Sequence, residues 1–197
     1  MTGGYDNTTG LIVVDVQNDF ADPNGNLYVN GGEQIMGAVN EQVASAVAAG
    51  ATVVYTQDWH PPDTPHFEKD GGIWPVHCVA DTWGAEFHPE LSVVSDAEIV
   101  RKGVSGEDGY SAFSVREPDT GRQHGTGLED MLWERGVQRV VVVGLATDYC
   151  VKETVLDARR CGLAVTVVAD GIRSVDLEPG DGERALEEMQ GAGAEIA

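Results

Sequence analysis

One cysteine in the C-terminal half of the chain has a setting that favours nucleophilic chemistry. Cys150 follows the apolar run 140–143 and a turn that begins at Gly144, and it precedes the amphipathic segment 151–160. This order predicts a buried strand, a tight turn and a helix with the thiol in its first turn. The unpaired N–H groups of a helix start favour the thiolate and can hold an oxyanion. The alternative is a small buried apolar residue, because free cysteines are commonly buried.

Two charged residues at the ends of other expected strands extend this chemistry. Asp15 lies in the β-branched run 11–16, where a buried carboxylate must be paired or protonated. Lys102 follows the short run 97–101, and a cation there would lower the pKa of a nearby thiol. A structural aspartate and a solvated lysine are the alternatives. With Cys150, the two residues supply a nucleophile, a proton shuttle and a cation, which suffice for covalent acyl transfer.

A second cluster combines one carboxylate with several imidazoles in a single loop. It consists of Asp58, His60, His66 and His77, which include three of the five histidines in the chain. Asp58 and His60 are two residues apart, so both side chains point the same way in an extended segment. Such mixed nitrogen and oxygen ligands suit zinc, iron or manganese. The alternative interpretation is that these are scattered surface histidines with no common ligand. The spacing leaves open which of the four bind the metal directly.

Aromatic residues accompany these polar ones. Phe20 follows the first expected strand, Trp74 precedes His77, and Tyr110 follows Lys102. Their common location in loops on one side of the sheet predicts a flat pocket for an aromatic ring.

The elements that position these residues alternate between strands and helices. Strands are expected at 11–16, 51–56, 97–101, 139–143, 163–168 and 194–196, and helices at 33–49, 126–135, 148–160 and 182–190. This alternation predicts one α/β domain over residues 1–197, with a mainly parallel sheet covered on both faces. Ligands bind such sheets at the carboxyl ends of the strands, where Asp15, Asp58, Lys102 and Cys150 all fall. The long irregular stretch 57–95 is typical of a functional loop.

The composition limits the partners. A formal net charge of −21 and a sequence pI of about 4.3 disfavour binding to nucleic acids or anionic membranes. Lysine occurs only at 69, 102 and 152, which suits either a salt-tolerant protein or a GC-rich genome. With no leader and no apolar run near 18 residues, and with three widely spaced cysteines, we expect a soluble cytoplasmic protein.

Six motifs, taken in order, resemble those of a known family, the nicotinamidases of the isochorismatase-like hydrolase superfamily. They are DVQNDF at 15–20, QDWHP at 57–61, WPVHCV at 74–79, KG at 102–103, YSAF at 110–113 and GLATDYCV at 144–151. The aspartate, lysine and cysteine are common to many members of the superfamily. Asp58, His60 and His77 together with Trp74 point to the nicotinamidase branch.

The resemblance implies a fold and a set of roles. The fold is a three-layer α/β/α sandwich with a six-stranded, mainly parallel sheet in the order 3-2-1-4-5-6. The implied roles are a catalytic triad of Asp15, Lys102 and Cys150, metal ligands Asp58, His60 and His77, and ring contacts from Phe20, Trp74 and Tyr110. His66 matches a position that is a further ligand in some members. A cis peptide between Leu145 and Ala146 would aim the N–H groups of Ala146 and Cys150 at the oxyanion.

The implied activity is metal-dependent hydrolysis of nicotinamide to nicotinate and ammonia, through a cysteine thioester, in NAD salvage. We expect one divalent transition metal ion, zinc before iron or manganese, with pyrazinamide as a second substrate and a homo-oligomer as the assembly. The alternatives are a superfamily amidase for a carbamoyl or ureido substrate, a non-enzymatic metal- or ligand-binding protein, and a redox thiol protein. The redox alternative lacks a resolving cysteine, since Cys161 is not at the C-x-x-C spacing.

The sequence departs from compact family members in two places. The segment 114–127 looks longer, and the loop 21–25 is less rich in glycine. Both are expected to border the entrance of the site.

Overall fold

Six parallel strands form the central sheet of the computed structural model, which describes residues 4–197. Its spatial order is β3-β2-β1-β6-β7-β8. When only these six strands are counted along the chain, the order reads 3-2-1-4-5-6, so the predicted fold class is confirmed. The strands are β1 (Thr9–Val14), β2 (Thr52–Asp58), β3 (Glu98–Lys102), β6 (Arg139–Leu145), β7 (Ala164–Arg173) and β8 (Glu195–Ile196).

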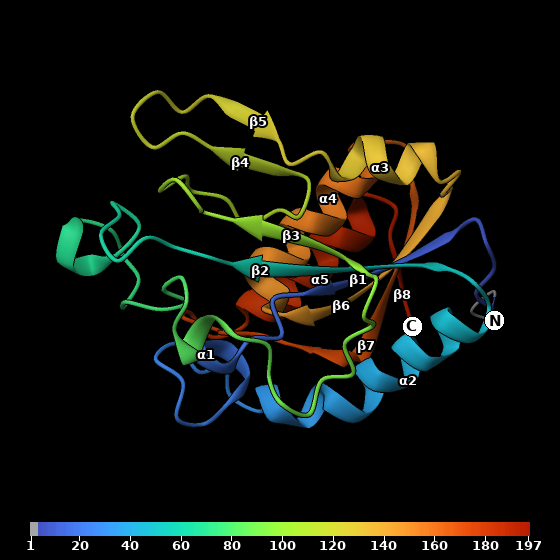
Figure 1. Ribbon diagram of the computed structural model, residues 1–197, viewed down its shortest axis with the longest axis horizontal. Helices are drawn as coiled ribbons and strands as arrows, with labels where there is room; N and C mark the ends of the chain where they lie inside the picture. Colours follow the sequence, from blue (N-terminus) through green and yellow to red (C-terminus); the bar gives the residue numbers. More distant parts are fainter. Residues whose placement is uncertain (1–3) are drawn as a thin grey trace.

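Helices cover both faces of the sheet, which gives three layers (Figure 1). Successive residues of β1 point to opposite faces. Leu11 and Val13 pack in the core that contains α2 (Met36–Ala48), whereas Ile12 and Val14 pack in the core on the other face. That second core receives side chains from α3 (Leu128–Glu134), α4 (Lys152–Arg160) and α5 (Asp181–Gly191).

The short elements gather in the loops. They are α1 (Asn18–Ala21) and the 3₁₀ turns η1 (Gly32–Ile35), η2 (Glu68–Asp70) and η3 (Trp83–Ala85). The arrowheads of β1, β2, β3 and β6 point to the end of the molecule where α1 and the long loop after β2 lie, and the C-terminus lies towards the opposite end (Figure 1). No helix among residues 4–197 is long and apolar enough to cross a membrane.

Several elements differ from the sequence-based expectation. The helix expected at 148–160 begins as a single π-helical turn, η4 (Thr147–Val151), before α4. β7 extends to Arg173 because an irregularity in its pairing with β6 allows Gly144 to pair with Ile172. The polar segment 114–127 contains an antiparallel hairpin of β4 (Ser114–Arg116) and β5 (Gln123–Gly125). β1 ends at Val14, so Asp15 follows the strand and has a positive φ of 48°.

Candidate active site

Lys102 lies at the centre of a buried charged cluster at the carboxyl ends of the strands. Its Nζ is 2.7 Å from Asp15 Oδ2, 2.9 Å from Asp58 Oδ1 and 3.4 Å from Cys150 Sγ. The Tyr110 carbonyl accepts a further bond from Nζ at 3.2 Å. Sheet order explains this convergence, because β3, β2, β1 and β6 are consecutive neighbours and each ends at the site. The structure therefore brings together the three residues of the predicted triad.

The turn before Cys150 requires a glycine. Gly144 has φ of 120°, and a Cβ there would lie 2.0 Å from the carbonyl oxygen of Val14. The peptide bond between Leu145 and Ala146 is cis, as the resemblance implies. Ala146 and Cys150 both line the pocket above the cluster.

Burial changes the protonation expected for this cluster. It raises the pKa of the Cys150 thiol well above its ordinary value, and the lowering effect of Lys102 does not compensate. The predicted lowering of the thiol pKa by Lys102 is present, but the effect of burial is larger. Burial also raises the pKa of Asp15 against the opposing effect of Lys102. A thiol with a raised pKa would need a base in order to act as a nucleophile.

The base candidate Asp15 is held by a residue that the sequence reasoning missed. Thr56 on β2 donates its hydroxyl hydrogen to Asp15 Oδ1 at 2.5 Å and accepts the Asp15 N–H at 3.1 Å. All of these atoms are buried. Thr56 thus fixes both the backbone and the carboxylate of Asp15 where β1 ends.

Thr56→Val is expected to lower the free energy of unfolding by about 2 kcal/mol, because it leaves a buried carboxylate and an N–H without their shared partner. Thr56→Ser keeps the hydroxyl and should retain most of that stability. Urea unfolding of both variants measures the difference. A Thr56→Val protein as stable as the wild type would show that the hydroxyl does not support Asp15.

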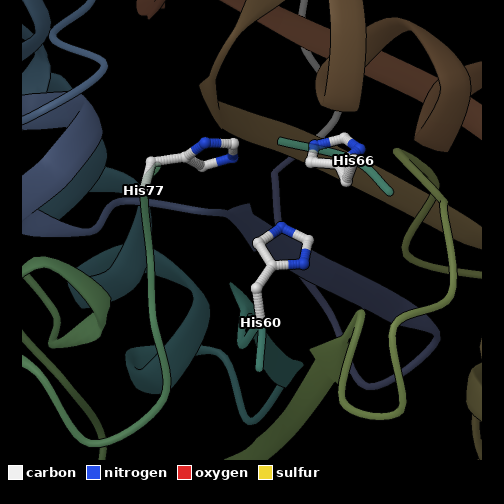
Figure 2. Close-up of side chains that lie close together, drawn as sticks. All are labelled: His60, His66 and His77. Carbon is white, nitrogen blue, oxygen red and sulfur yellow. The ribbon is translucent and has the colours of Figure 1, made fainter. Parts of the chain in front are cut away.

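A group of three imidazoles lies beside the charged cluster. Figure 2 shows the rings of His60, His66 and His77 converging on one space, and one nitrogen of each lies within 4.8 Å of the others. Asp58 Oδ2 is 3.7 Å from His60 Nε2 and 3.9 Å from His77 Nε2. The four residues predicted from the sequence are therefore neighbours, and His66 lies with the other two histidines.

The donor atoms of this group fit a metal ion. Neither ring nitrogen of His60 has a hydrogen-bond partner in the described part of the chain, although the ring is buried. His77 Nδ1 is 2.7 Å from the Pro75 carbonyl, and His66 Nδ1 is 3.1 Å from Asp108 Oδ1, which leaves each Nε2 for a ligand. Three nitrogens and one carboxylate oxygen suit zinc and related divalent transition metals.

The protonation of this group also suits a metal ion. Burial lowers the pKa of His77 to about 4, so its ring is neutral near neutral pH. Burial alone would raise the pKa of Asp58, but the Lys102 charge and the His60 ring hold that pKa well below its usual range. Asp58 is therefore a carboxylate, the form that binds metals.

Gly103 allows His60 to approach the end of β3. Its φ is 75°, and a Cβ at this position would lie 2.4 Å from His60 Nδ1. A side chain there would displace the ring, so the glycine after Lys102 serves the histidine group.

A pocket opens above Cys150 and beside the histidines. Its polar lining comes from Asp58, His66 and His77. The three predicted aromatic residues, Phe20, Trp74 and Tyr110, also line it. The other lining residues are Leu27, Val29, Leu145, Ala146, Tyr149 and Val175. Trp74 Nε1 donates to the Tyr110 hydroxyl at 3.0 Å. The ring of Tyr149 meets that of Trp74 edge-on, with centroids 4.8 Å apart.

Tyr149 and Val175 are pocket residues that the sequence analysis missed. Tyr149 directly precedes Cys150, and this position next to the candidate nucleophile was the available signal. Val175 follows β7, and nothing in the local sequence marks it. Asp148 holds it in place, because its two carboxylate oxygens accept the N–H groups of Val175 at 3.0 Å and Asp176 at 2.8 Å.

Comparison with known proteins agrees with this geometry. The family model of the isochorismatase domain matches residues 9–197. The chain belongs to the isochorismatase family. It is 38% identical over 202 residues to the nicotinamidase of Escherichia coli (strain K12), which covers 94% of this chain and 92% of that protein.

Two solved structures are near neighbours in fold. The pyrazinamidase of Pyrococcus horikoshii in complex with zinc has a TM-score of 0.86 at 40% identity, covering 96% of this chain and 98% of that one. PnC1 from L. infantum in complex with nicotinate has a TM-score of 0.88 at 35% identity, covering 100% and 96%. The resemblance predicted from the sequence is confirmed, and these relatives support a hydrolase of the nicotinamidase type.

Proposed function

We propose that this protein hydrolyses nicotinamide to nicotinate and ammonia through a thioester on Cys150. The observation that carries the proposal is one pocket whose lining includes both Cys150, which contacts Lys102 beneath it, and Asp58, His66 and His77 of the second group. The nicotinamidase and pyrazinamidase relatives support the same substrate class.

The buried charged cluster performs the covalent chemistry. Asp15 takes the proton of Cys150, and Sγ attacks the amide carbon, while Lys102 stabilises the negative charge. The N–H groups of Ala146 and Cys150 hold the oxyanion until the C–N bond breaks. Asp15 gives its proton to the departing ammonia, and a water molecule then hydrolyses the thioester to nicotinate, which frees Cys150.

The second group binds and orients the substrate. Asp58, His60, His77 and His66 would hold a divalent transition metal ion, with zinc the first choice and iron or manganese the alternatives. When bound, the ion supplies a Lewis-acid site for the pyridine nitrogen. Phe20, Trp74, Tyr110 and Tyr149 supply the walls against which the ring packs.

Ammonia release from nicotinamide, with and without prior metal removal, tests the proposal. We expect turnover by the metal-loaded enzyme, its loss after chelation and its recovery with zinc. Benzamide is the matched control substrate, because it has the same shape and amide but lacks the ring nitrogen, and it should be hydrolysed far more slowly. Nicotinamide turnover that is insensitive to chelation would favour an amidase for a carbamoyl or ureido substrate.

Four further proposals accompany this assignment. Pyrazinamide, which has a similar ring and the same amide, should be a second substrate in the same assay. In the cell the product nicotinate would return to NAD in a salvage route, and we place the enzyme in the cytoplasm. A homo-oligomer is the proposed assembly, and sedimentation of the purified chain measures it.

A further inference from the structure

We propose that Asp108 is a positioning residue of the metal centre, whose carboxylate holds His66 in the orientation that presents Nε2 to the ion. The inference rests on the metal centre of the proposed function and deepens it. It gives a role to a residue outside the motifs that identify the family.

The contact between the two side chains is direct. Asp108 Oδ1 is 3.1 Å from His66 Nδ1, and the His66 side chain is 8% exposed. A carboxylate accepts only, so Nδ1 must carry the hydrogen, and Nε2 keeps its lone pair. The His66 ring also stacks on His60, with centroids 4.8 Å apart. Carboxylate partners of this kind fix the tautomer and ring orientation of metal-binding histidines.

Asp108 is itself held by the hairpin. Its N–H donates to the Arg116 carbonyl at 2.8 Å, and the Arg116 N–H donates back to the Asp108 carbonyl at 2.5 Å. Arg116 ends β4, and Ser114 at the start of β4 donates its hydroxyl to Asp157 of α4 at 2.8 Å. The longer segment 114–127 thus connects α4 to the histidine group through Asp108.

Among the three histidines, His66 is the one whose ring is held by a side chain, so a substitution can remove that contact. His77 is held by a backbone carbonyl, and His60 approaches the backbone of Gly103. Of the hydrogen-bond partners found for these three rings within residues 4–197, Asp108 alone supplies a side chain. Its removal should loosen one ligand and leave the rest of the cluster in place.

Zinc affinity of the full-length protein, measured by competition with a chromophoric chelator after metal removal, tests the inference. Asp108→Ala should weaken zinc binding by about 10- to 100-fold. Asp108→Asn keeps an acceptor oxygen and should recover most of the loss. Glu107→Ala is the matched control, because that neighbouring carboxylate accepts the Ser105 N–H instead, and its zinc affinity should equal that of the wild type.

A spectroscopic measurement separates positioning from general damage. The visible absorption of the Co²⁺-loaded protein reports ligand number and geometry, so Asp108→Ala should change this spectrum and Glu107→Ala should not. Unchanged zinc affinity and Co²⁺ spectrum in Asp108→Ala would overturn the inference.

Two ligand variants distinguish failure of the inference from failure of the proposed function. If His66→Ala binds zinc as tightly as the wild type while His77→Ala binds it more weakly, the inference is overturned but the proposed metal centre stands. No zinc binding by the wild type, or full binding by both variants, would overturn both.

Discussion

Replacing Cys150 with alanine is expected to reduce nicotinamide turnover by at least about a thousandfold, the scale of loss when a covalent nucleophile is removed. Among the described residues that line the pocket, no other side chain offers a thiol or an aliphatic hydroxyl. The two histidines that line the pocket, His66 and His77, belong to the proposed metal centre. No second nucleophile is therefore available to replace Cys150. The measurement is ammonia release under single-turnover and steady-state conditions.

Two controls make the Cys150 result specific. Cys150→Ala should still bind nicotinamide, because the ring walls and the histidine group are intact, and calorimetry measures this affinity. Acid quenching of the wild type followed by mass spectrometry should reveal the acyl-enzyme, and the variant should show none. Ammonia release by Cys150→Ala within tenfold of the wild-type rate would exclude the covalent route.

Lys102→Met should destabilise the fold as well as abolish activity. The substitution nearly preserves side-chain volume but leaves Asp15 and Asp58 buried near each other without their shared cation. Breaking such a pair costs about 3–5 kcal/mol, which corresponds to a fall in Tm of about 10 °C for a chain of this length. Thermal unfolding followed by circular dichroism measures the shift.

The pH dependence of the Lys102→Met defect follows from the carboxylates. Removal of the ammonium should raise the folded-state pKa of both buried acids, so the folded variant should bind protons more readily than the folded wild type. Stability relative to the wild type should therefore improve as the pH falls towards 4 and worsen as it rises. Lys152→Met, which removes a partly exposed lysine beside Glu153 and Glu188, is the control and should change stability by less than about 1 kcal/mol. A defect independent of pH would contradict the buried-charge explanation.

The strands of the sheet were predictable because their signal is local. β1 and β6 are β-branched runs covered on both faces, and such runs stand out in any sequence. The hairpin of β4 and β5 was missed because each strand has only three residues, none of them buried, and no run of apolar residues marks either strand. The far end of β7 was missed because it contains Asp170 and Gly171, and its pairing depends on an irregularity opposite Gly144.

The charged and aromatic residues of the site could be found from the sequence, but the residues that hold them in position could not. A buried aspartate and a lysine at strand ends are unusual in type and position, which makes them visible. Thr56 and Asp108 are ordinary residues whose partners, Asp15 and His66, are 41 and 42 positions away. Only the folded chain shows these contacts.

The net direction of the Cys150 pKa could not be predicted for a related reason. The sequence shows the helix start and the charged lysine, both of which lower the pKa of a thiol. It does not show that Cys150 is 5% exposed, and burial raises the pKa of the thiol more than the nearby cation lowers it.

Asp58 belongs to both halves of the site. One of its oxygens faces Lys102, and the other faces His60 and His77. Substitutions among the histidines and substitutions in the lysine cluster therefore share a partner, and their effects should not add when combined. In evolutionary terms, a lineage that lost the histidines would still be constrained to keep Asp58 as a counter-ion. The carboxylate can thus outlast the proposed metal centre, and its presence in a distant relative is weak evidence for a metal ion there.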